Sequence, residues 1–141
     1  MIFSFLLLLG LTAPASAKFD DAELQKRMKS EEPILIYTWS PHMVLSQKGI
    51  SELLANKDRP FKVLVVMDAS ASEKLAKEIV KKNGWPASFL EKNESGTLLG
   101  RGARIHYPSY QFVSRGALLS PLIPGYRTPA ELKQISARYL P

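Results

Sequence analysis

The side chains best suited to chemistry in this 141-residue sequence lie in one short run, Ser40-Pro41-His42-Met43. A serine acts as a nucleophile only when a base lies within hydrogen-bond reach and a third group orients that base. Ser40 and His42 are two residues apart at the expected start of a helix, which does not favour this geometry, and no glycine-flanked nucleophile turn is present. We therefore expect Ser40 to cap a helix rather than to attack a substrate.

A copper site is the second chemical hypothesis. His42, Met43 and His106 offer imidazole and thioether groups, which are ligands that suit Cu(I). These residues would gather if the loop with His106 lay beside the turn with His42, and Met67 would end a strand near the same edge. In the opposing interpretation both methionines belong to the core and His106 is merely exposed. We keep copper handling through His42, Met43 and His106 as the alternative function, and otherwise expect no cofactor.

The sequence contains no cysteine. This absence excludes a disulfide scaffold, a thiolate zinc site and an iron–sulfur cluster. It also excludes a thiol nucleophile, because cysteine is the residue that supplies a thiol. Without a thiolate the chain cannot attack a disulfide.

The first 17 residues form a segment of their own. Ile2–Leu11 is an apolar run, and the small residues Ala15-Ser16-Ala17 follow it. This order is typical of a secretory signal, and the run is shorter than the roughly 20 residues that a membrane-spanning helix needs. We predict a signal peptide over residues 1–17, cleaved near Ala17, and a periplasmic or secreted domain over residues 18–141. A retained membrane anchor is the alternative.

Hydrophobic periodicity and capping residues predict the elements of that domain. We expect a helix from Asp20 to about Lys29, strands over 33–39 and 61–67, helices over 42–56 and 72–83, a hairpin of 109–114 with 117–123, and a final helix capped by Thr128. Residues 85–105 contain too many glycine, proline and asparagine breaks for a long element. We interpret them as an irregular excursion.

The element order predicts the fold class. A crossover helix between two buried strands requires these strands to be parallel, and the closing hairpin adds an antiparallel half. The sequence therefore predicts an α/β sandwich of three layers, in which a central mixed sheet of about four strands has helices on both faces.

Three motifs in this order resemble the thioredoxin superfamily. Trp39-Ser40-Pro41-His42-Met43 stands at the strand-to-helix turn, Asp68 ends the next strand, and Tyr107-Pro108-Ser109-Tyr110 precedes the hairpin. Ser40-Pro41-His42-Met43 is similar to the Cys-Pro-His-Cys of periplasmic disulfide oxidoreductases, with both cysteines replaced. Thiol–disulfide exchange needs an attacking thiolate and a resolving thiol. We therefore expect a redox-inactive protein that is not an enzyme.

The resemblance implies a binding site. In the superfamily an extended peptide lies between the active-site turn and a cis-proline loop, in a form of strand addition. We expect a protein- or peptide-binding, chaperone-like module of the cell envelope, with a groove lined by Trp39, Ser40, Pro41, His42, Met43, Tyr107, Pro108 and Tyr110. If the aromatic side chains are simply packed in the core, no ligand is implied.

The net charge of +6 is spread along the chain. Lys74, Lys77, Lys81 and Lys82 lie largely on one helix face, which is most often a solvated face but could contact anionic envelope components. Arg101 and Arg104, beside glycines, are candidates for contact with an anionic group. We expect no nucleic acid partner, because no stacking aromatic residues lie among the basic ones.

Overall fold

The computed structural model describes residues 18–99 and 106–141, and it contains a mixed sheet with helices on both faces. The strand order is β1-β4-β3-β2-β5-β6, and β7 also pairs with β5. The strands are β1 (Lys18–Phe19), β2 (Ile34–Trp39), β3 (Lys62–Asp68), β4 (Lys92–Asn93), β5 (Ser109–Ser114), β6 (Ala117–Leu118) and β7 (Ile123–Pro124). The helices are α1 (Asp21–Met28), α2 (Val44–Ala55), α3 (Glu73–Asn83), the 3-10 helix η1 (Ala87–Leu90), α4 (Gly96–Leu99) and α5 (Pro129–Tyr139).

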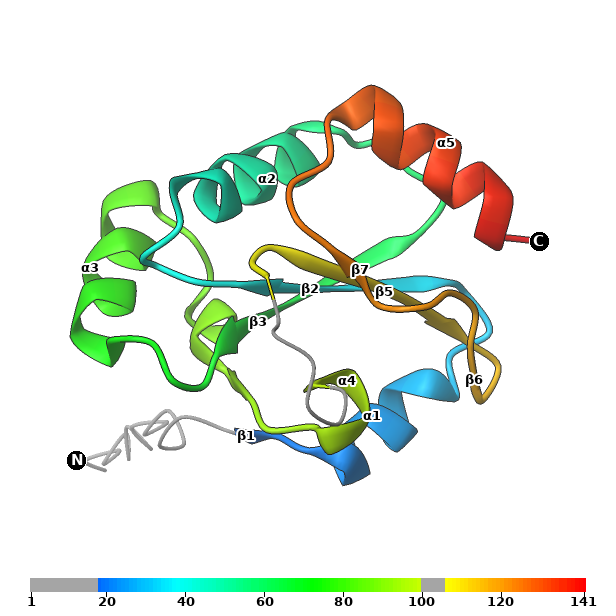
Figure 1. Ribbon diagram of the computed structural model, residues 1–141, viewed down its shortest axis with the longest axis horizontal. Coiled ribbons are helices and arrows are strands. Elements are labelled where there is room, and N and C mark those ends of the chain that lie inside the picture. The colour runs from blue at the N-terminus through cyan, green and yellow to red at the C-terminus, as the bar shows by residue number, and fades with distance from the viewer. Residues whose placement is uncertain (1–17, 100–105) are drawn as a thin grey trace, which may run out of the picture.

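The layers match the predicted sandwich. Figure 1 shows α2 and α5 above the sheet and α1 and α4 below it, with α3 beside the β3 end. Strands β2 and β3 are parallel, and β2 and β5 are antiparallel. The fold class is confirmed. Within residues 18–99 and 106–141 the sheet has seven strands rather than about four, and the four additional strands are only two residues long.

Strand β2 is buried along its whole length because both of its faces are covered. Successive side chains alternate between the two faces. Leu35, Tyr37 and Trp39 join the core under α2 and α5, whereas Ile34 and Ile36 join the core that includes residues of α1. The continuous apolar run in the sequence therefore reflects a central strand, as predicted.

Three helices begin at side-chain caps, and at α3 the cap is Ser72, one of the two candidates, Ser70 and Ser72, that the sequence offers. The Asp20 and Ser72 side chains accept hydrogen bonds from backbone N–H groups of α1 and α3, respectively. Thr128 and Glu131 form a reciprocal capping box at α5. Each such cap contributes about 1 kcal/mol to stability.

The predicted hairpin is present, but its second strand is divided. Arg115 and Gly116 both have positive φ angles, as a two-residue turn between twisted strands requires. The partner segment pairs with β5 as β6 and again as β7. Between them, the buried Ser120 accepts a hydrogen bond from the Phe112 backbone N–H (3.0 Å) and interrupts the ladder.

The described part of the excursion, residues 85–99, is more regular than predicted. It forms η1, β4 and α4, and β4 pairs in parallel with both β1 and β3. Polar side chains anchor it: the Ser95 hydroxyl donates to the Asp21 carboxylate (2.6 Å), and the Asn93 amide donates to Thr38 (3.2 Å). Tertiary hydrogen bonds of this kind are not encoded in local sequence periodicity. Arg101 and Arg104 lie outside the described residues.

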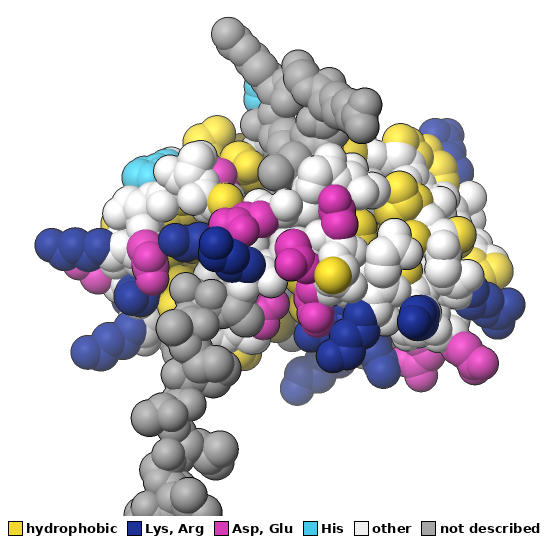
Figure 2. Space-filling model, turned by 90° about the horizontal axis from the view of Figure 1, so that it is seen from below, with side chains coloured by type: hydrophobic (Ala, Val, Ile, Leu, Met, Phe, Trp, Pro, Cys, Tyr) yellow, Lys and Arg dark blue, Asp and Glu magenta, His cyan; other side chains and the backbone are white. Residues whose placement is uncertain are grey.

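The face that carries α1 has mixed charges. Figure 2 views the molecule from this side and shows acidic side chains between basic ones. Arg27 pairs with Glu23 (2.8 Å) and Lys18 with Glu94 (3.6 Å). On this face, the basic excess is therefore dispersed rather than concentrated.

In residues 18–99 and 106–141, no helix has the length and apolar character needed to cross a membrane. The predicted signal peptide, residues 1–17, lies outside the described residues.

One close approach determines how α2 sits on the sheet. Gly49 of α2 faces Tyr37 of β2, and a Cβ atom at position 49 would lie 2.2 Å from the Tyr37 hydroxyl oxygen. That oxygen donates a hydrogen bond to the Ser46 carbonyl (2.6 Å), so it cannot move away freely. Glycine is therefore required at position 49 by packing rather than by backbone conformation.

Gly49→Ala should lower the free energy of unfolding by about 1–3 kcal/mol because of overpacking. Helix propensity alone predicts the opposite sign, a gain of about 1 kcal/mol. Urea unfolding of Gly49→Ala, with the exposed Ser51→Ala in the same helix as the control, distinguishes the two effects. In a Tyr37→Phe background the loss should shrink, and an equal loss in both backgrounds would contradict the assigned contact.

The anchoring of α1 to the excursion should depend on pH. The hydrogen bond from the Ser95 hydroxyl, followed by that from the Thr97 backbone, lowers the pKa of Asp21 below its usual value. The unfolded chain then binds a proton at a higher pH than the folded chain, so this stabilisation is present above about pH 4 and is lost as the pH falls further.

Urea unfolding at pH 7 and pH 3 tests this pH dependence. Asp21→Asn should be less stable than the wild type at pH 7, and the difference should narrow at pH 3. Ser95→Ala should weaken the pH dependence of the wild-type carboxylate. An unchanged difference between wild type and Asp21→Asn across this range would refute the assignment.

Candidate functional site

The turn after β2 closes through backbone hydrogen bonds. The Met43 N–H donates to the Ser40 carbonyl (3.1 Å), and α2 then begins at Val44. Met43 occupies the N-cap position without a side-chain cap. The prediction that Ser40 caps the helix is therefore wrong, because the helix begins four residues after Ser40. The Ser40 hydroxyl instead accepts a hydrogen bond from the His42 backbone N–H (3.3 Å) within the turn.

A buried hydrogen-bond network holds this turn against the sheet. The Ser46 hydroxyl accepts the Ser40 N–H (2.9 Å), and the Ser46 carbonyl accepts the Tyr37 hydroxyl (2.6 Å). The Trp39 indole N–H donates to the Phe89 carbonyl (2.8 Å) and so ties the same strand end to η1. Burial raises the pKa of Tyr37 strongly, so its hydroxyl stays protonated as a donor.

Ser46 has a structural role that the sequence analysis missed. It lies on the inner face of α2 with Ile50 and Leu53, and it is fully buried. A small polar residue within an apolar helical stripe is the signal that could have identified it. Its function is to position the turn.

The strand register brings the second motif to the same end of the sheet. Ser109 pairs with Thr38, so the loop before β5 and the turn after β2 leave the sheet together. The Tyr107–Pro108 peptide bond is cis, and the Pro108 carbonyl accepts the Gly125 N–H (2.8 Å).

Asp68, the acidic residue at the end of β3 that also supports the resemblance, contacts this loop through Tyr107. Burial and the neighbouring Asp68 carboxylate raise the pKa of Tyr107 well above its usual value. Asp68 also accepts hydrogen bonds from the Ser70 N–H (3.0 Å) and hydroxyl (2.8 Å). The ends of β2, β3 and β5 therefore meet around Tyr107.

Only part of the predicted groove lining reaches the surface. His42 and Met43 are exposed and Tyr107 is half-buried, whereas the side chains of the other five predicted residues are buried: Trp39, Ser40, Pro41, Pro108 and Tyr110. These five position the site rather than form its surface. Tyr110 packs edge-to-face on Tyr37 (5.2 Å between ring centroids) and lines a cavity between α2 and α5 instead.

His42 is directed toward α3. Its Nε2 accepts the Ser72 backbone N–H (3.2 Å), so this nitrogen is not available to remove a proton from Ser40. The Ser40–His42 pair is therefore not arranged for nucleophilic catalysis.

The structure removes one residue, Met67, from the possible copper ligands. Met67 is fully buried in the core and cannot join a site at the turn. Among residues 18–99 and 106–141, no group of three or more His, Asp or Glu side chains could hold a metal ion. His106 is exposed like His42 and Met43. Copper binding by these three residues stays a prediction.

An exposed apolar segment adjoins the turn. The exposed fractions of Met43, Val44 and Leu45 are 45%, 76% and 50%, and these residues form the end of the turn and the first residues of α2. They lie outside the buried stripe of that helix, which contains Ser46, Gly49, Ile50 and Leu53. Val44 and Leu45 are additions to the predicted site.

Ser46→Ala should test the network that holds the turn. The substitution leaves the Ser40 N–H buried without an acceptor, so the free energy of unfolding should fall by about 1–3 kcal/mol. Ser51→Ala, on the exposed side of α2, should change it by less than about 0.5 kcal/mol. Equal effects of the two substitutions in urea unfolding would show that the Ser46 hydroxyl does not hold the turn.

Comparison with known proteins gives a likeness of structure alone. No family model and no curated protein matches this sequence. A putative thioredoxin from Neisseria meningitidis is 18% identical, with a TM-score of 0.56, over 80% of this chain and 77% of that one. An exposed lipoprotein thioredoxin from Streptococcus pneumoniae is also 18% identical, with a TM-score of 0.54 over 78% and 87% of the two chains. A thioredoxin-family thiol:disulfide interchange protein from Chlorobium tepidum is 13% identical, with a TM-score of 0.58 over 83% and 85%. Together with the strand order and the two motifs at one end of the sheet, these likenesses show that the chain has a thioredoxin-like fold.

Proposed function

We propose that this protein is an exported, redox-inactive thioredoxin-like protein that binds a protein or peptide of the cell envelope. Binding would occur at a surface formed by His42, Met43, Val44, Leu45 and Tyr107, which we name the turn surface. The observation that carries this proposal is the exposure of three consecutive large apolar side chains beside the turn.

The energetics of these side chains support a binding role. Scattered exposed apolar residues are common, but a contiguous group marks an interaction site more often. Burying one aliphatic side chain completely against a partner contributes about 1.5–3 kcal/mol. Met43, with its flexible thioether, could adapt to partners of different shape.

The chain has no cysteine, so its own side chains cannot carry out thiol–disulfide exchange. Ser40 and Met43 stand where the resemblance places the two cysteines. The buried network around Ser46 nevertheless preserves the turn. A site that keeps its shape after losing its reactive groups fits binding better than catalysis.

Two observations support export. The composition of residues 1–17 is that of a signal peptide, and one of the similar structures is an exposed lipoprotein. Contact of the exposed lysines of α3 with anionic envelope components stays a subsidiary prediction; these lysines are Lys74, Lys77, Lys81 and Lys82.

A photo-crosslinking amino acid at Met43 of the full chain in its native host should capture a discrete protein. The same amino acid at Ser51, exposed on the same helix, should not. The captured protein, once purified, should bind wild type and bind Val44→Asp about tenfold or more weakly, because a buried aliphatic contact is lost.

Val44→Asp is suited to this test because folding is not at risk. Residue 44 is 76% exposed, and an acidic residue in the first turn of a helix is favourable. Ser51→Asp adds the same charge elsewhere on α2 and should bind like wild type. Equal adducts at Met43 and Ser51, or equal affinity of the two aspartate variants, would refute the turn surface.

A further inference from the structure

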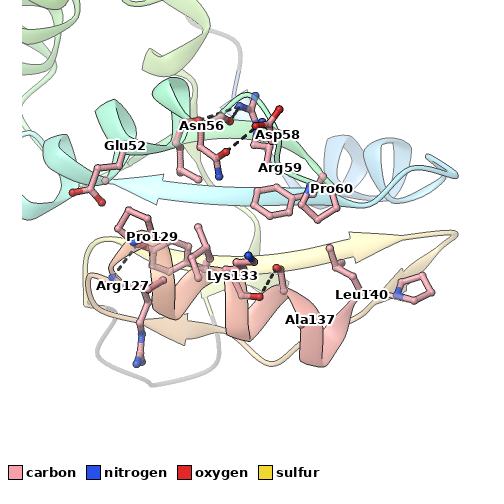
Figure 3. A pocket seen from close by; sticks show the side chains of 18 residues that line it. Glu52, Asn56, Asp58, Arg59, Pro60, Arg127, Pro129, Lys133, Ala137 and Leu140 are labelled. Atoms are coloured by element: carbon pink, nitrogen blue, oxygen red, sulfur yellow. Dashed lines mark hydrogen bonds between the residues drawn. The ribbon is translucent and has the colours of Figure 1, made fainter.

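A second candidate site lies between α2 and α5, at the other end of α2 from the turn surface. It is a cavity of about 890 Å³, and Figure 3 shows the side chains around it. Its apolar lining includes Leu53, Phe61, Tyr110 and Leu132, which are core residues. Small-molecule sites typically have volumes of about 300–1,000 Å³ and mostly apolar walls.

Small residues leave this space open. Gly49 on α2 and Ala130, Ser136 and Ala137 on α5 face the cavity from its two helical walls. Gly49 cannot become larger, since a Cβ would collide with Tyr37.

Three cationic side chains line the same cavity: Arg59, Arg127 and Lys133. Within the described part of the chain, none of them forms an ion pair. The Nε atoms of both arginines are buried without a hydrogen-bond partner there. Because no described carboxylate neutralises these three charges, an anionic ligand would be attracted to the cavity.

The acidic side chains of the lining do not neutralise these three cations. Glu52 accepts the Tyr126 hydroxyl at both carboxylate oxygens (2.7 and 2.8 Å) and lies 3.8 Å from the Lys48 ammonium. Asp58 makes no ion pair with a described residue. The described lining therefore contains three cationic side chains and one side-chain carboxylate, that of Asp58, without such a partner.

Arg59 is held in place before any ligand arrives. Its Nη1 donates to the carbonyls of Leu53 (3.0 Å) and Asn56 (2.6 Å) at the end of α2. Figure 3 shows Arg59 on the α2 side of the cavity and Lys133 on the α5 side. A ligand with an anionic group would therefore meet positive charge on both walls, a fixed guanidinium on one and a flexible ammonium on the other.

We propose that this cavity binds a single-chain amphiphile with a carboxylate head group. The head group lies between Arg59 and Lys133, and the apolar chain covers Leu53, Phe61 and Leu132. This function is separate from peptide binding at the turn surface and does not depend on it.

Calorimetric titration of the full chain with dodecanoate, below its micellar concentration, tests the proposal. Wild type should bind one molecule saturably. Ala137→Phe fills the cavity and Lys133→Glu reverses a head-group contact, so each should weaken binding by about tenfold or more. Positions 133 and 137 are both exposed, and thermal unfolding checks that the variants fold.

Three controls test whether binding depends on this cavity and on the charge of the head group. Gln134→Phe adds the same ring to α5 at an exposed position that does not line the cavity, and it should bind like wild type. Val44→Asp should also bind like wild type, since it alters only the turn surface. Dodecanol, which lacks the charge, should bind about tenfold more weakly than dodecanoate.

The proposal is overturned by any of three results. These are the absence of saturable dodecanoate binding to wild type, equal binding by Ala137→Phe and Gln134→Phe, and equal affinity for dodecanol and dodecanoate. A loss of binding in Val44→Asp would also overturn it, because it would place the ligand at the turn surface.

Discussion

The hydrogen bond from the Tyr37 hydroxyl to the Ser46 carbonyl is the contact on which the candidate site depends. It joins the central strand to the helix that follows the turn, and it lies in the core, where an unsatisfied polar group would be costly. The Ser46 hydroxyl continues the network to the Ser40 N–H. The turn therefore keeps one shape although neither Ser40 nor Met43 can form the covalent bond that two cysteines could.

The same contact constrains the rest of α2. Gly49 is needed because the Tyr37 hydroxyl occupies the space of a side chain, and this glycine also faces the cavity between α2 and α5. One helix thus presents exposed apolar residues at its start and an unfilled wall near its end. The inner face of α2 is tightly packed between these two regions, and Gly49 is its point of closest approach to the sheet.

The fold could be predicted because its elements are locally consistent. The apolar run of β2 and the caps Asp20 and Thr128 each point to one structure, and the crossover rule then orders the strands. The excursion could not be predicted in this way. Its strand β4 depends on pairing with β1 and β3, and these contacts are distant in sequence.

The sequence by itself determined the fold class and the absence of thiol chemistry, because composition, periodicity and element order carry this information. The meeting of the two motifs was implied by the resemblance to the thioredoxin superfamily. Only the tertiary structure decided which side chains are available. It buried Trp39, Ser40 and Tyr110, exposed Val44 and Leu45, and left a cationic cavity beside α5. The physical reason is that exposure depends on which helix face packs against the sheet and on what the neighbouring elements cover, and both are settled by contacts between residues far apart in the chain.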